Sequence, residues 1–394
     1  MAKRHTFFPH DWQTIAVRLD EIISAHSGED AFEEALKLLV AKLAYERGGE
    51  PGRGFLADHD RALDEGNRLL QQAARQGLIE PGAILRLRPP EIVRCAAVLG
   101  SVHLLAQDLV GLDAMFEFMV NKAAKGQKGQ YFTPRYVVAD VVRMLDPGAR
   151  HLVADPACGS GGFLRHALLH APRCFVWGFD QDARAVRVAR VMLAASGQPA
   201  SRIMLADSLA LPGKADVLAI EDLMRAHDAS FRGFDMILTN PPFAGDVGTT
   251  VGYELARGRH VERDVLFIER CVGLLRPGGR LAMILPHNKL GGKAWAHLRK
   301  WLLARVRVVA VLGLGRNTFQ PHTSQKACVL VGQKRVRPTV LAPDEEILFF
   351  ISERDGKDTR GHICYGPDGK TVVHDLAEAV SLVRDRFKQV AEAI

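Results

Sequence analysis

The chain has 394 residues, of which 47% are hydrophobic and 25% charged, with a formal net charge of +7. It is long enough for two or three domains and can bury a large core without disulfides. Its six cysteines form no CxxC pair, which argues against a disulfide framework or a structural zinc site. No apolar run reaches membrane-spanning length and no signal peptide is visible, so we expect a cytoplasmic protein without membrane association.

The first third of the chain is predicted to be helical. Apolar residues recur at helical spacing, and no strand-like alternation interrupts them. The predicted helices cover residues 11–26, 29–47, 59–77, 89–109 and 112–124, followed by a polar loop at 121–130. We expect an all-helical domain over residues 1–125 that carries no catalytic group and docks partners or DNA.

From about residue 126 the pattern changes to short apolar strands that alternate with amphipathic helices. Strands are predicted near 151–155, 174–180, 202–206, 234–239, 280–285, 307–313 and 325–332, with helices at 182–196 and 264–275 and a turn at "RPGG". Such alternation indicates an α/β domain with a mostly parallel sheet. We predict this domain over residues 126–340, and a C-terminal strand and helix (375–392) over residues 341–394.

A glycine-rich loop, "DPACGSGG", follows the first predicted strand. Gly159, Gly161 and Gly162 stand between a strand and a helix, where glycine allows a tight turn and close approach to a ligand. A plain strand–helix turn would explain the glycines equally well. The spacing matches neither a nucleotide-triphosphate P-loop nor the GxGxxG pattern of nicotinamide-binding folds.

Two aspartates follow the next two strands. Asp180 ends the second strand, where an acid commonly accepts ribose hydroxyl groups, and Asp207 ends the third. Each could instead cap a helix or a turn. Because the glycine loop and both carboxylates meet at the same edge of a parallel sheet, together they predict a pocket for an adenosine-containing ligand.

The fourth strand ends in Asn240-Pro241-Pro242-Phe243. The Asn240 side chain and the Pro241 carbonyl are acceptors, the prolines stiffen the loop, and Phe243 offers a flat ring. This set suits an exocyclic amino group on a flat heterocycle. The alternative is a rigid turn whose phenylalanine fills a gap in the core.

The segments "DPACGSGGFL", "NPPF" and "GQYFTPR" together resemble the N6-adenine DNA methyltransferases, and most closely the modification subunit of type I restriction–modification systems. The resemblance implies a Rossmann-like methyltransferase fold with a seven-stranded sheet whose last strand is antiparallel. It implies methyl transfer from S-adenosyl-L-methionine (AdoMet) to the N6 amino group of adenine in DNA, without a metal.

The resemblance also implies roles for individual residues. The catalytic set would be Asn240, Pro241, Pro242 and Phe243. The cofactor-binding set would be Tyr131, Phe132, Thr133, Asp155, Pro156, Ala157, Gly159, Ser160, Gly161, Gly162, Phe163, Asp180, Gln181, Asp207, Ser208 and Asn240. The family often has Glu where this chain has Asp180, so the shorter side chain weakens the reach toward a ribose.

The partners expected are double-stranded DNA and a separate specificity subunit, because too little chain follows residue 340 to build a base-reading domain. The loop 244–263 is basic at its end and suits phosphate contacts, although a solvated loop explains it equally well. Two alternatives stay open. One is a non-catalytic subunit that binds AdoMet and DNA in a defence complex. The other is a protein glutamine methyltransferase, in which Tyr typically replaces Phe243.

Overall fold

The computed structural model describes residues 9–26, 29–48, 54–100, 102–105, 115, 133–213, 218–243, 245, 251–321, 323–339 and 345–392. The chain forms two compact units. The first comprises residues 1–127 and 183–203, and the second comprises residues 128–182 and 204–394. The three-domain division predicted from the sequence stays a prediction.

The first unit is helical. It contains α1 (Pro9–His26), α2 (Ala31–Gly48), α3 (Ala62–Arg75), α4 (Pro89–Leu99), α8 (Ala183–Ala195) and the short turn η1 (Ala200–Arg202). Val188, Val191 and Met192 of α8 are buried in the same apolar core as the N-terminal helices. A helix that precedes the third strand therefore completes the core of the N-terminal helices.

Three of the N-terminal helices match the sequence prediction closely, but the fourth is shorter than predicted. The apolar pattern predicted a helix over 89–109, whereas α4 ends at Leu99 and residues 102–105 are not helical. Gly100 has a low helix propensity, and Val102 and Leu104 are buried in the core without a helix. The predicted helix at 112–124, except for Met115, and the predicted loop at 121–130 lie outside the described residues.

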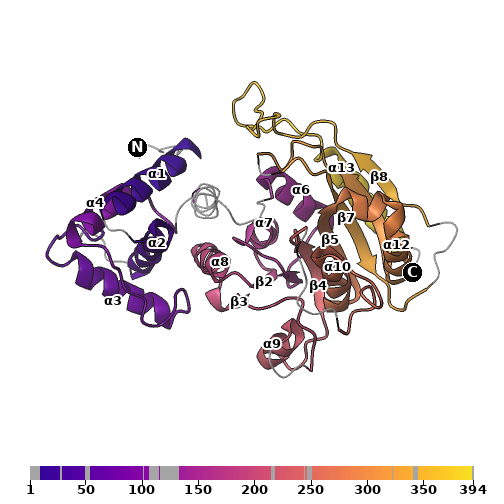
Figure 1. Ribbon diagram of the computed structural model, residues 1–394, viewed down its shortest axis with the longest axis horizontal. Helices are drawn as coiled ribbons and strands as arrows, with labels where there is room; N and C mark the ends of the chain where they lie inside the picture. Colours follow the sequence, from indigo (N-terminus) through magenta and orange to yellow (C-terminus); the bar gives the residue numbers. More distant parts are fainter. Residues whose placement is uncertain are drawn as a thin grey trace. The chain divides into compact units, whose positions relative to one another are not determined.

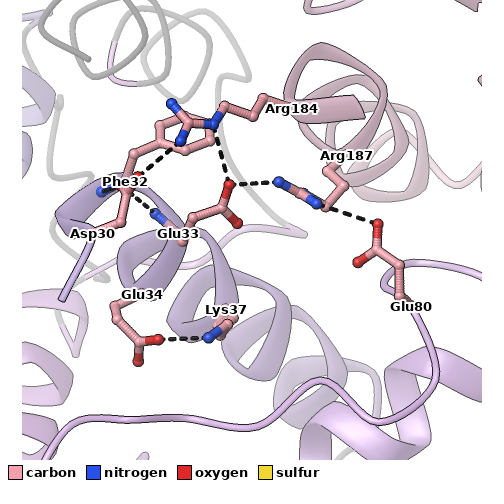
Figure 2. Close-up of polar contacts among 8 residues, drawn as sticks. All are labelled: Asp30, Phe32, Glu33, Glu34, Lys37, Glu80, Arg184 and Arg187. Carbon is pink, nitrogen blue, oxygen red and sulfur yellow. Dashed lines mark hydrogen bonds and ion pairs between the residues drawn. The ribbon is translucent and has the colours of Figure 1, made fainter. Parts of the chain in front are cut away.

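Ion pairs add to the contact between α8 and α2 (Figure 2). Arg184 lies 2.8 Å from Asp30 and 3.3 Å from Glu33. Arg187 also pairs with Glu33 and lies 3.4 Å from Glu80. Asp30 accepts a hydrogen bond from the Phe32 amide as well, in the manner of a helix N-cap, so one carboxylate starts α2 and binds α8.

Within the described residues, one eight-stranded sheet forms the α/β part of the chain, in the order β3-β2-β1-β4-β5-β7-β6-β8. Figure 1 shows this sheet with helices packed beside it. The strands are β1 (Leu152–Asp155), β2 (Phe175–Asp180), β3 (Ile203–Leu205), β4 (Phe234–Thr239), β5 (Leu275–Pro286), β6 (Val306–Gly313), β7 (Ala327–Lys334) and β8 (Leu348–Ile351). β1 is parallel to β2 and β4, and β4 is parallel to β5. β7 is antiparallel to both β5 and β6.

The α/β fold class with a mostly parallel sheet is confirmed, but the sheet in the described part of the chain has eight strands and not seven. The additional strand is β8, the strand predicted in the C-terminal tail, which pairs in parallel with β6 at the edge of the sheet. β5 also starts earlier than predicted. The "RPGG" segment was predicted as a turn, but it belongs to β5, where Gly278 takes a φ of 77°.

Helices of the second unit pack against the sheet. They are α6 (Arg135–Leu145), α7 (Gly162–His170), α9 (Ile220–His227), α10 (Arg263–Leu274), α11 (His287–Gly291), α12 (Ala296–Arg305) and α13 (Glu378–Glu392), with the short turn η2 (Lys293–Trp295). Leu281, Met283 and Leu285 of β5 share a core cluster with α10 and α12. Since side chains alternate along a strand, Ala282 and Ile284 point to the other face.

No helix within the described parts of the chain is both long and apolar enough to span a membrane.

Candidate functional site

The loop between β1 and α7 is shaped by glycines. Gly159 has a φ of 51° and Gly161 a φ of 87°, which are left-handed conformations that other residues adopt at a cost. A Cβ atom added to Gly159 or Gly162 would meet no atom within 4 Å. The loop is therefore open on the side where these two glycines lack side chains, and its backbone is accessible to a ligand.

Asp155 ends β1 beneath this loop. Its side chain is buried, and Oδ1 accepts a hydrogen bond from the Ala157 amide at 3.0 Å. Burial raises the pKa of Asp155 to about 7, and the charge of Asp180 acts in the same direction. The carboxyl group is thus poised to lose its proton when a cation comes close.

Asp180, at the end of β2, fixes the glycine loop. Its Oδ2 accepts a hydrogen bond from the Gly159 amide and its Oδ1 accepts one from the Asp182 amide, both at 2.9 Å. Burial also raises the pKa of Asp180. Each oxygen of a carboxylate can accept about two hydrogen bonds, so the two oxygens retain acceptor capacity for hydroxyl groups.

The end of β3 is joined to the same loop. Ser208 is buried and its hydroxyl group donates to the Pro156 carbonyl. Asp207 is exposed, and its Oδ1 accepts a hydrogen bond from the Leu209 amide at 3.0 Å. The predicted cofactor residues at the ends of β1, β2 and β3 are thereby brought together.

A buried ion pair supports this corner, and sequence reasoning missed it. The Nε–H group of Arg270, in α10, donates a hydrogen bond to the Ser208 carbonyl at 2.8 Å, and both Nη groups donate to the Glu221 carboxylate. The Arg270 side chain is only 2% exposed. The sequence signal for this ion pair was a charged residue, Arg270, within the apolar pattern of α10. That pattern does not reveal which residues Arg270 contacts.

At the end of β4, Asn240 is held by the segment that precedes α6. Its Nδ2 donates to the Thr133 hydroxyl at 3.0 Å. Its Oδ1 is buried and has no hydrogen-bond partner among the described residues. A buried acceptor without a donor costs roughly 1–3 kcal/mol, so this oxygen is suited to receive an N–H group from a ligand.

Phe243 does not present an exposed ring. It is 5% exposed and meets Phe319 edge to face, with ring centroids 6.1 Å apart and an interplanar angle of 78°. This contact fits the alternative in which the ring fills a gap in the core. The role of Phe243 as a stacking platform stays a prediction, and a base that stacks on it must enter beside Phe319.

The remaining predicted residues are distributed around the glycine loop. Ser160 is half-buried, Phe163 is buried in α7, and Gln181 is exposed after β2. Tyr131 and Phe132 lie outside the described residues. In the part of the chain that the structure describes, no group of three or more His, Cys, Asp or Glu side chains is arranged to hold a metal ion.

Known proteins resemble both the sequence and the fold. A profile of the N-6 DNA methylase family matches residues 106–362. The type I restriction enzyme StySPI methylase subunit of Salmonella potsdam is 27% identical over 218 residues, which is 52% of this chain and 41% of that protein. The type II methyltransferase M.VspI of Vibrio sp. (strain 343) is 24% identical over 227 residues, 56% of this chain and 52% of that protein.

The fold of the methyltransferase subunit of the type I restriction-modification system from Streptococcus thermophilus is similar. The two structures have a TM-score of 0.67 at 15% identity, over 96% of this chain and 92% of the other. The chain spans about half or less of the length of the two curated relatives described above. Because the family profile covers more than half of the chain, this protein belongs to the N-6 DNA methylase family.

Proposed function

We propose that the protein transfers a methyl group from AdoMet to the N6 amino group of adenine in DNA. The observation that carries this proposal is Asn240, whose Oδ1 is a buried acceptor without a partner while its Nδ2 is held by Thr133. Beside it, Pro241 and Pro242 fix the backbone and contribute carbonyl acceptors but no N–H donors. Acceptors are what an amino group requires.

The residues near the glycine loop fit AdoMet. Their open glycine positions leave room for a ligand, and the carboxylates of Asp155, Asp180 and Asp207 gather at the ends of three neighbouring strands. AdoMet has an ammonium group, ribose hydroxyls and an adenine amino group, all of which suit carboxylate acceptors. When bound, AdoMet supplies an electrophilic methyl group on its sulfonium sulfur.

The task of the chain is to position the adenine. A base inside a duplex is out of reach, so it must be flipped out at a cost of a few kcal/mol. Acceptors at Asn240 Oδ1 and the Pro241 carbonyl would hold the two hydrogens of the amino group. They would thereby direct its lone pair toward the methyl group. Alignment alone can lower the barrier by several kcal/mol, so neither a metal nor a covalent nucleophile is required.

We further propose that the protein acts in a restriction–modification or related defence system together with a separate specificity subunit. The StySPI relative is named as the methylase subunit of a type I restriction enzyme. The N-terminal helices and α13 are the proposed docking surfaces. α13 buries Val380, Val383 and Phe387 on one face, whereas Leu382 on another face is 49% exposed.

A methylation assay tests the proposal. Purified protein, AdoMet with a labelled methyl group and unmethylated plasmid are incubated with and without the specificity subunit, and digests are analysed for N6-methyladenine. We expect methylation with the subunit, little without it, and none for Asn240→Ala, which should still bind AdoMet. Near-normal turnover by Asn240→Ala would contradict the catalytic assignment. Methylation of a glutamine in protein, or of nothing, would favour one of the two alternative functions.

A further inference from the structure

A basic turn follows the corner at Asn240–Phe243 along the chain. Arg257, Gly258, Arg259 and His260 are all exposed, and we refer to these four residues as the basic turn. Its backbone is folded tightly, because the Arg257 amide donates to the Glu254 carbonyl at 3.2 Å and the Arg259 amide to the Ala256 carbonyl at 3.1 Å. Two guanidinium groups and one imidazole are thus presented to solvent by a compact piece of chain.

The residues on both sides of the basic turn anchor it in the second unit. Those that are buried in the apolar core are Tyr253, Leu255, Ala256 and Val261. The Tyr253 hydroxyl donates to the Leu209 carbonyl at 2.7 Å, and the Glu269 carboxylate accepts the amides of Glu254 and Leu255 at 2.8 and 2.9 Å. The turn is therefore held in a fixed position.

The nearby acids do not neutralise the basic turn. Glu254 accepts hydrogen bonds from Trp301 and Arg305 at 2.8 and 2.6 Å, and Glu262 pairs with Lys289. Among the described residues, no carboxylate lies within 4.0 Å of a charged nitrogen of Arg257, Arg259 or His260. The positive charge of the turn is consequently available to a polyanion.

The segment that carries the basic turn packs beside α10 and α12. Glu254, three residues before the turn, accepts hydrogen bonds from Trp301 and from Arg305, the last residue of α12, and the segment ends where α10 begins, at Arg263. Lys289, three residues after the end of β5, meets Glu262 and lies 3.4 Å from Asp264. This buried lysine ties the end of the segment to the carboxyl end of β5, next to β4 and Asn240.

We propose that the basic turn binds DNA phosphates beside the target adenine. The inference rests on the proposed function and specifies which surface receives the DNA backbone. Arginine suits this role, because its planar guanidinium can bind a phosphate with two parallel hydrogen bonds. Contacts of this kind position the duplex without reading its sequence, which agrees with specificity supplied by a separate subunit.

The test is the salt dependence of DNA binding. Fluorescence anisotropy with a labelled 20-base-pair duplex measures the association constant of the full chain, with saturating AdoMet, between 50 and 200 mM salt. Each phosphate contact contributes roughly −0.9 to the slope of log K against log salt concentration. In the Arg257→Ala/Arg259→Ala variant this slope should therefore become less negative by about 2. In the Arg257→Lys/Arg259→Lys variant, which keeps both charges, the slope should stay close to that of the wild-type chain.

A matched control removes the same charge elsewhere in the second unit. Arg150 and Arg173 are exposed, precede β1 and β2, and are joined by a backbone hydrogen bond of 3.0 Å. Arg150→Ala/Arg173→Ala should leave the slope unchanged. An unchanged slope in the Arg257→Ala/Arg259→Ala variant, an equal loss in the control, or no binding by the wild-type chain at 50 mM salt overturns the proposal. Binding with the expected slopes but without adenine methylation would contradict the proposed activity and leave the phosphate surface supported.

Discussion

The buried carboxyl group of Asp155 predicts that AdoMet affinity depends on pH. Burial raises its pKa to about 7, so below that pH most molecules carry the neutral acid. AdoMet is cationic and should prefer the ionised form. The affinity for AdoMet should rise as the pH increases toward 7, because a growing fraction of the protein carries the ionised Asp155 carboxylate that a cationic ligand prefers.

The size of the effect follows from the fraction of ionised carboxylate. With a pKa of about 7, that fraction is roughly 0.1 at pH 6 and 0.5 at pH 7, and the apparent dissociation constant scales inversely with it. Affinity should thus increase about fivefold over this interval, or about 1 kcal/mol. The interval lies below the pKa of an α-amino group, about 7.7–8.0, so the charge of the ligand stays nearly constant.

Isothermal titration calorimetry measures both the affinity and the protons released. Titrations at pH 6 and pH 7, each in two buffers of different ionisation enthalpy, should show proton release by the wild-type chain. Asp155→Asn should bind more weakly, with a much smaller change in affinity between the two pH values. Asp207→Asn removes an exposed carboxylate from the same group of strand ends and should keep the pH dependence. A wild-type affinity that is flat between pH 6 and 7, or an unchanged slope in Asp155→Asn, refutes the reasoning.

Two further substitutions test the supports of the site. Arg270→Met leaves the Glu221 carboxylate without its buried partner, and breaking such a pair typically lowers the free energy of unfolding by about 3–5 kcal/mol. Urea unfolding followed by tryptophan fluorescence should show this loss, and the double variant Arg270→Met/Glu221→Leu should recover part of it. Thr133→Val removes the acceptor that holds Asn240 Nδ2, so kcat should fall, and Thr133→Ser should restore kcat. If Arg270→Met unfolds at the same urea concentration as the wild-type chain, the ion pair does not support the site. If Thr133→Val keeps the wild-type kcat, Thr133 does not position Asn240.

The sequence predicted the sheet better than the helices. The predicted strand at 234–239 coincides with β4, because an apolar run that stops at a polar, proline-rich corner has unambiguous ends. The helix at 89–109 was too long, because Val102 and Leu104 keep the apolar spacing while they enter the core without helical structure. Apolar periodicity indicates which side chains are buried, but it does not always indicate whether the backbone there is helical.

The supports of the candidate site could not be predicted from sequence patterns. Arg270 and Glu221 are 49 residues apart, and Arg270 and Ser208 are 62 residues apart. No local spacing rule connects residues that only the fold brings together. Motifs identified the strand-end residues that are expected to touch ligands, whereas the side chains that hold those residues in place became visible only in the structure.

The position of α8 links the candidate cofactor corner to the proposed docking surface through the chain itself. Asp180 accepts the Asp182 amide, and α8 begins at the next residue, Ala183. Within two turns of that start, Arg184 and Arg187 bind the acids of the N-terminal helices (Figure 2). The carboxylate that fixes Gly159 and the two arginines that bind acids at the N-terminal helices therefore stand within eight consecutive residues, 180–187, so a single short stretch of sequence serves both the candidate cofactor corner and the helical core.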